Sequence, residues 1–168
     1  MILAFGDSLT YGFGVAHNLS YPKHIENKTD FKVINAGVNG EYSHSGLERL
    51  SKLLNKHKPH TVILCHGAND ILNRLPSSRL KGNLLAMIDL IKESAAKILF
   101  VGVPDYYHYS FDTHAIYKEV AKETNVIFID NVLTTIASDS SLRNDDVHPN
   151  HRGYELMADT FIKILKID

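Results

Sequence analysis

Short, almost uninterrupted hydrophobic runs alternate along the chain with longer stretches in which apolar residues recur every three or four positions. Five runs rich in β-branched and aromatic residues predict strands at residues 1–5, 31–37, 60–67, 97–103 and 125–130. Runs that lack polar alternation are typical of strands covered on both faces. The sequence therefore predicts a buried, parallel sheet.

Four amphipathic stretches lie between or after these runs. Their apolar residues have helical spacing, which predicts helices at residues 46–57, about 80–95, 114–124 and 153–165. Strands that alternate with helices indicate an α/β fold, with helices on both sides of the sheet. We find no internal repeat, low-complexity segment or linker, so we expect one domain over residues 1–168.

Composition narrows the class of protein. The chain has 168 residues, 44% of them hydrophobic and 22% charged, with a formal net charge of −1. These values are ordinary for a globular domain and argue against electrostatic capture of nucleic acid or of an anionic membrane. The single cysteine, Cys65, excludes an intrachain disulfide, and its apolar surroundings predict that it is buried. The sequence predicts no oligomeric state.

No targeting segment is evident. The apolar run at residues 1–5 is too short for a signal peptide, and no stretch approaches the roughly 20 apolar residues of a spanning helix. We therefore expect a cytoplasmic protein without stable membrane insertion. The mature form of an exported protein would present the same pattern.

Polar groups follow the predicted strands at their carboxyl ends, where the sites of open α/β sheets gather. The first strand leads into Ser8, the second into "NAGVNGEYS", the third into "GANDI" and the fourth into "PDYYHYSFDTH", and "DDVHPN" precedes the last helix. We expect these segments to converge at one edge of the sheet. Four of the five carry the groups that acyl transfer requires.

Ser8 needs a base to act as a nucleophile. The candidate is His148, because a histidine side chain titrates near pH 6.5 and can exchange protons at neutral pH. Asp145, three residues earlier, reaches the imidazole if the segment makes a tight turn, and the adjacent Asp146 competes for that role. An alternative is a metal site formed with His151, but no second cluster of ligands stands at another strand end, so we expect no metal and no cofactor.

An oxyanion needs donors that are in place before it forms. The candidates are the backbone N–H groups of Ser8 and Gly40 and the side-chain amide of Asn69. Each has a structural alternative: a loop serine, a glycine that supplies a positive φ, and an asparagine in a turn. Their coincidence at successive strand ends favours the catalytic interpretation.

Aromatic residues cluster near these groups. Tyr106, Tyr107 and Tyr109 follow the fourth strand, and Tyr11 follows Ser8. They predict a substrate-binding wall, since ligand sites favour aromatic surfaces with a few polar groups. Packing onto the domain is the alternative.

Four segments together resemble the SGNH hydrolases, the branch of the GDSL esterases and lipases named for four invariant residues. They are "GDSL" at 6–9, "NAGVNGE" at 35–41, "GAND" at 67–70 and "DDVHPN" at 145–150. They occur in the family's order. The resemblance spans nearly the whole chain and is greatest to small bacterial thioesterases, arylesterases and lysophospholipases.

The resemblance implies a role for each matching residue. Ser8 would be the nucleophile, and Asp145 and His148 would complete the triad. Gly40 and Asn69 would belong to the oxyanion hole, with Gly37 as the second choice for the glycine. The implied fold is a flavodoxin-like three-layer α/β/α sandwich with five parallel strands.

The sequence therefore leads to a functional hypothesis. We expect a serine esterase that hydrolyses carboxylic esters or thioesters of small to medium acyl groups. Removal of O-acetyl groups from carbohydrate is an alternative with the same chemistry. A non-catalytic flavodoxin-like binding module is an alternative of another class, but it would be expected to lack one of the catalytic residues. Nucleotide binding is disfavoured, because "GFG" at 12–14 is too little for a dinucleotide fingerprint.

Overall fold

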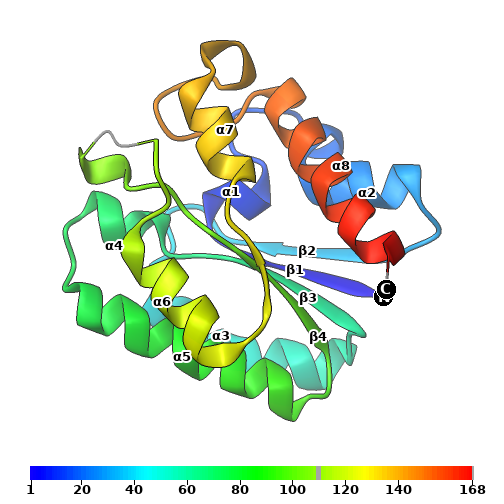
Figure 1. Ribbon diagram of the computed structural model, residues 1–168. Coiled ribbons are helices and arrows are strands. Elements are labelled where there is room, and N and C mark those ends of the chain that lie inside the picture. Colours follow the sequence, from blue (N-terminus) through cyan, green and yellow to red (C-terminus); the bar gives the residue numbers. More distant parts are fainter. Residues whose placement is uncertain (109–110, 168) are drawn as a thin grey trace.

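The computed structural model describes residues 1–108 and 111–167 and contains an open, all-parallel sheet (Figure 1). Its strands, within the described residues, are β1 (Ile2–Gly6), β2 (Val33–Gly37), β3 (Thr61–Cys65), β4 (Lys97–Val101) and β5 (Ile127–Ile129). Their order is β2-β1-β3-β4-β5. All five predicted strands and the α/β class are confirmed.

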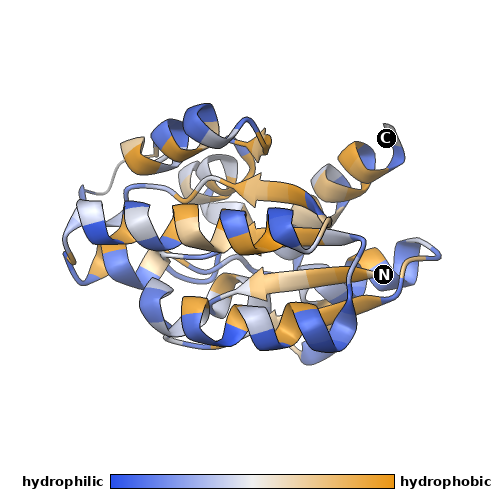
Figure 2. Ribbon diagram, turned by 90° about the horizontal axis from the view of Figure 1, so that it is seen from below, coloured by the Kyte–Doolittle hydropathy of each residue, from blue (hydrophilic) through white to orange (hydrophobic). Residues whose placement is uncertain are grey.

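Helices cover both faces of this sheet. On one face α3 (Ser43–His57), α5 (Ser77–Glu93) and α6 (Ala115–Thr124) pack side by side. On the other face α2 (Tyr21–Lys28) packs against α8 (His151–Ile167). Figure 2 shows hydrophobic and hydrophilic residues alternating along the helices, and the buried residues of α5 recur at helical spacing. The result is the predicted three-layer α/β/α sandwich.

Burial explains the apolar runs. Every residue of β1 and of β3 is buried, because these strands lie inside the sheet and have helices on both faces. The edge strand β2 is only partly covered along its length. The continuous hydrophobic pattern of the two central strands is therefore what the structure requires.

Several short elements were not predicted. They are α1 (Ser8–Tyr11), α4 (Ala68–Leu72), α7 (Val132–Ser138), the α2 helix, and the 3₁₀ helices η1 (His17–Leu19), η2 (Tyr106–His108) and η3 (Ser140–Leu142). Helices of one or two turns are too short to show a hydrophobic period, and α2 is mostly polar in sequence. The predicted strand at 60–67 was also too long, since the chain turns at Gly67, whose φ is +105°.

The register sets the ends of three strands level. Gly6, the last residue of β1, pairs with Gly37 of β2 on one side and with Cys65 of β3 on the other. The connections from β1 to β2 and from β2 to β3 run in opposite directions across the sheet, so the carboxyl end of β1 is a topological switch point. Ligands of open α/β sheets bind at such points.

Candidate active site

Ser8 begins the one-turn helix α1 immediately beyond β1. The buried Asp7 caps this helix: its carboxylate accepts hydrogen bonds from the N–H groups of Leu9 and Ala68, at 3.1 Å each. Burial raises the pKa of Asp7, although His66 and the backbone N–H groups oppose that shift. Because Ala68 belongs to α4, Asp7 fixes the Ser8 turn to the turn that carries Asn69.

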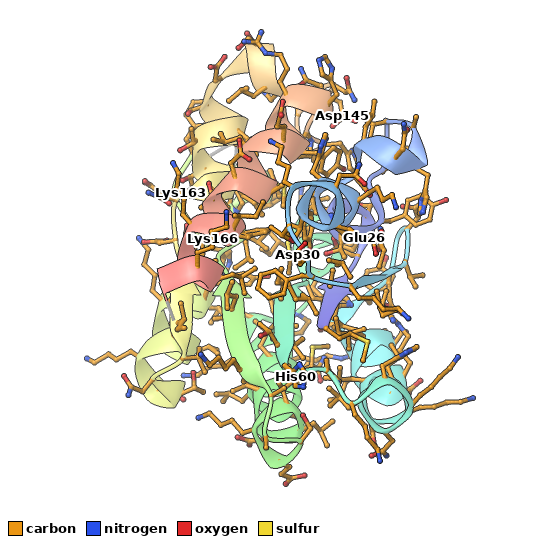
Figure 3. The ribbon with its side chains drawn as sticks, turned by 90° about the vertical axis from the view of Figure 1, so that its right-hand side faces the viewer. Glu26, Asp30, His60, Asp145, Lys163 and Lys166 are labelled. Atoms are coloured by element: carbon orange, nitrogen blue, oxygen red, sulfur yellow. The ribbon has the colours of Figure 1, made fainter. Side chains whose placement is uncertain are left out.

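Ser8, His148 and Asp145 form a continuous series of hydrogen bonds. The Ser8 hydroxyl lies 3.0 Å from Nε2 of His148, and Nδ1 of His148 lies 2.9 Å from Oδ2 of Asp145. A carboxylate can only accept, so Nδ1 carries the proton and Nε2 is free to accept from Ser8. Ser8 lies two residues beyond the end of β1, so this series lies at the carboxyl edge of the sheet. Figure 3 shows Asp145 near the top of the view, well above His60.

The loop of residues 144–149 is folded around the Asp145 carboxylate. Oδ1 of Asp145 accepts from the backbone N–H groups of Val147 and His148, at 2.8 and 2.7 Å. Burial raises the pKa of Asp145, but the hydrogen bonds from His148 and Val147 outweigh it and hold the pKa below its usual range. Asp146 instead points to Arg143, with 76% of its side chain exposed. The structure thus brings Asp145, and not Asp146, against the imidazole.

A second loop covers His148. The Phe13 ring lies 4.5 Å from the imidazole, centroid to centroid. The Tyr154 hydroxyl donates to the Phe13 carbonyl, and the Asn144 amide donates to the Gly14 carbonyl. These contacts join segments 130 to 141 residues apart in sequence, and no local motif signals them.

The three predicted oxyanion donors lie on adjacent turns. Gly40 has a φ of +71° in a turn closed by a hydrogen bond from the Glu41 N–H to the Val38 carbonyl. The Asn69 amide donates to the Glu41 carbonyl at 3.0 Å and keeps a second N–H hydrogen. Within the described part of the chain, the N–H groups of Ser8 and Gly40 have no protein acceptor. The Gly37 N–H is already bonded to the Asn35 side chain.

The four tyrosines predicted to bind substrate do not share one environment. Tyr106 is buried, and its hydroxyl donates to the Val147 carbonyl. This hydrogen bond holds the loop that carries His148. Tyr107 lies under the guanidinium of Arg74 and lines a pocket of about 210 Å³ with Ile71 and Leu80. Tyr11 is 46% exposed. Tyr109 lies outside the described residues.

The structure also tests the other features that the sequence suggested: Cys65, His66, a metal site and a membrane-spanning helix. Cys65 is fully buried, as predicted, and burial raises the pKa of its thiol well above the usual range. His66 is fully buried too and bonds to Glu41. Over residues 1–108 and 111–167, no group of three or more His, Cys, Asp or Glu side chains is arranged to hold a metal ion. No helix in these ranges is long and apolar enough to cross a bilayer.

Comparison with known proteins decides the family. Residues 4–156 match the model of the GDSL-like lipase/acylhydrolase family. The chain belongs to this family. An arylesterase of Vibrio mimicus is 32% identical, over 94% of this chain and 84% of that protein. The thioesterase 1/protease 1/lysophospholipase L1 of Escherichia coli K12 is 28% identical, over 98% and 83% of the two chains.

Solved structures agree with this assignment. The psychrotrophic esterase EstA from Pseudoalteromonas sp., inhibited by monoethylphosphonate, superposes with a TM-score of 0.86 at 28% identity, over 99% of this chain and 96% of that one. The GDSL family member described here is therefore an SGNH-type hydrolase, with the fold of that family.

Proposed function

We propose that this GDSL family member is a serine esterase that works through a Ser8–His148–Asp145 triad and an acyl-enzyme. The observation that carries the proposal is the unbroken hydrogen-bond series from the Ser8 hydroxyl through both nitrogens of His148 to Asp145. This arrangement holds the imidazole in the tautomer that can take the serine proton. The hydrogen bonds that two backbone N–H groups donate to Asp145 keep its carboxylate ionised and oriented.

In the first half of the reaction, Ser8 Oγ attacks the carbonyl carbon of the substrate while its proton passes to Nε2 of His148. The negative charge moves to the carbonyl oxygen, where the N–H groups of Ser8 and Gly40 and the Asn69 amide receive it. The tetrahedral intermediate then collapses. The imidazolium gives its proton to the departing alcohol or thiol, and the acyl group remains on Ser8.

Water completes the cycle. His148 removes a proton from a water molecule, and the resulting nucleophile attacks the acyl carbonyl. The same three donors hold the second oxyanion. The bond between Ser8 Oγ and the acyl carbon then breaks. Oγ takes the proton from His148, and the carboxylic acid is released. Every step uses side chains and backbone groups of this chain.

The surroundings of the triad support a class of substrate. The ring of Phe13 is 45% exposed and lies against His148, so it offers apolar surface beside the triad. We infer small to medium acyl groups as substrates, in line with the arylesterase and thioesterase names of the relatives.

The test is hydrolysis of p-nitrophenyl acetate, butyrate and octanoate by the wild type and by Ser8→Ala. Loss of a triad serine lowers kcat by about 10⁶-fold, so turnover should fall to background with all three esters. The ranking of kcat/KM across the wild-type series then measures the acyl preference. A Ser8→Ala variant as active as the wild type would exclude this mechanism, and a folded wild type without turnover would favour a binding module.

A further inference from the structure

Glu41 is a nearly buried carboxylate with no part in the steps above. Only 8% of its side chain is exposed. It accepts two hydrogen bonds from Arg49, from Nε at 2.7 Å and from Nη2 at 2.6 Å, and a third from Nε2 of the fully buried His66 at 3.0 Å. A two-point contact of this kind fixes both the position and the plane of the carboxylate.

Arg49 extends this fixation to the sheet. Its Nη2 also donates to the carbonyls of Ala36, at 2.8 Å, and Gly6, at 3.2 Å. Its guanidinium lies 4.3 Å from the centroid of the Phe5 ring. The side chain therefore spans the carboxyl ends of β1 and β2 and directs its Nε and Nη2 groups to Glu41.

Each of the three proposed oxyanion donors is linked to this ion pair through one hydrogen bond or through a neighbouring residue. Glu41 follows Gly40, and its own N–H closes the turn that sets the direction of the Gly40 N–H. The Glu41 carbonyl accepts from the Asn69 amide. Gly6, held by Arg49, is two residues before Ser8. A single, partly buried ion pair thus links the turns that follow β1, β2 and β3, at the point where the oxyanion would form.

The charge of the pair matters as well as its geometry. Burial raises the pKa of Glu41, but the hydrogen bonds from His66 and Arg49 outweigh it and hold the pKa below the usual range. An uncompensated carboxylate next to Gly40 would oppose the developing oxyanion. Arg49 cancels that charge, so the donors act on the oxyanion without an adverse field.

We propose that the Glu41–Arg49 pair is a positioning device of the oxyanion hole, which sets the Gly40 turn and the Asn69 amide for the transition state. The inference rests on the proposed function, because it assigns the pair a role in that same reaction. Both residues act through Gly40 and Asn69 and touch no reacting atom.

The test compares Glu41→Gln and Arg49→Gln with the wild type on p-nitrophenyl butyrate. Misplacement of groups by about 1 Å can cost about 100-fold in rate, so we expect kcat to fall by about 10- to 100-fold while KM stays within about threefold. The acid limb of the pH profile should not move, because the base is untouched. Lys81→Gln, which removes two surface ion pairs between α5 and α6, is the matched control and should keep wild-type kcat.

Two controls separate a loss of activity from a loss of folding. Circular dichroism melts establish the folded fraction at the assay temperature. The variants Glu41→Asp and Arg49→Lys retain the charges and replace any glutamine variant that does not fold. We expect these milder variants to lose kcat too, because lysine cannot make the two-point contact and the shorter aspartate cannot place its carboxylate where Glu41 does.

Folded variants with kcat within about threefold of the wild type would overturn the inference, and so would a loss confined to KM. Failure of the proposed function looks different. In that case the wild type itself shows no turnover with any ester, whatever residue stands at 41 or 49.

Discussion

At the scale of single residues, three carboxylates near Ser8 have three different environments. Asp7 is fully buried, its carboxylate accepts only from backbone N–H groups among the described residues, and its pKa is raised. Glu41 is buried against Arg49 and His66, and Asp145 is half exposed against His148; the pKa of each is lowered. Burial opposes ionisation in every case, so the partners decide the charge.

Asp145 and Asp146 offer a matched pair of substitutions. Asp145→Asn should lower kcat by about 10⁴-fold, because an amide favours the wrong imidazole tautomer. Asp146→Asn removes only an exposed contact to Arg143 and should leave kcat within about twofold. Steady-state kinetics on p-nitrophenyl butyrate measures both. Equal losses in the two variants would contradict the assignment of Asp145 as the partner of His148.

The lowered pKa of Asp145 has a consequence for the pH profile. A carboxyl with a lowered folded pKa stays ionised until the pH falls through that pKa, so Asp145 does not titrate in mildly acidic solution. Protonation of Asp145 should then contribute nothing to the loss of activity as the pH falls in that range. We predict that log kcat/KM rises with pH with a slope no greater than one. A slope of two would contradict this.

The same sign governs stability. The hydrogen bonds to ionised Asp145 stabilise the fold at pH values above the unfolded pKa, near 3.8. That contribution is lost as the pH falls through the lower folded pKa.

At the scale of elements, two glycines show how closely helices approach the sheet. A Cβ at Gly46, inside α3, would collide with Nε2 of the buried His66, so α3 can lie against the end of β3 only with glycine there. A Cβ at Gly82, inside α5, would meet nothing within 4 Å. The first glycine is required by packing, and the second is not.

Alanine at the two positions should therefore act in opposite directions. Gly46→Ala should lower the free energy of unfolding by about 1–3 kcal/mol, because a tightly packed site must shift to admit the methyl group. Gly82→Ala should raise it by about 0.5–1 kcal/mol, since alanine restricts the unfolded chain. Urea unfolding measures both. A stabilising Gly46→Ala would show that His66 is not held where the structure places it.

At the scale of the whole molecule, strand order and register create the site. Ser8, Gly40 and Asn69 follow three strands that are neighbours in the sheet but not all in sequence order, and His148 comes from the segment before the final helix. The packed α/β/α sandwich holds the ends of these strands in register. The proposed reaction at this edge thus depends on a hydrophobic core that contains none of the proposed reacting groups.

A cavity in that core should lower stability without changing the chemistry. Leu99 lies in β4 and is almost fully buried. Leu99→Ala should cost about 2–5 kcal/mol of unfolding free energy. At 15 °C, where the variant should remain folded, we expect wild-type kcat, measured beside a circular dichroism melt. A folded variant with a large loss of kcat would place Leu99 closer to the reaction than the account allows.

Much of this arrangement could be predicted from the sequence. The strands were predictable because burial on both faces demands continuous apolar runs, and their carboxyl ends identified the segments that meet. The choice of Asp145 over Asp146 was not available from spacing, since both lie within one turn of His148. It depends on which carboxylate the loop's backbone N–H groups surround.

The contacts of Phe13, Glu41 and Arg49 were equally hidden. Phe13 meets His148 across 135 positions of sequence, and Arg49 meets Gly6 across 43. No period or local motif records such distances. Helices α1 and α4 were missed because one turn cannot display a 3.6-residue period.

The most direct test of the central claim is the intact mass of the protein after reaction with a fluorophosphonate, followed by peptide mapping. The account predicts one adduct on the wild type, located on Ser8, and none on Ser8→Ala. His148→Ala should react far more slowly, because the hydroxyl lacks its base. An adduct on another residue, or an unlabelled wild type that is folded, would contradict the claim that Ser8 is the activated nucleophile.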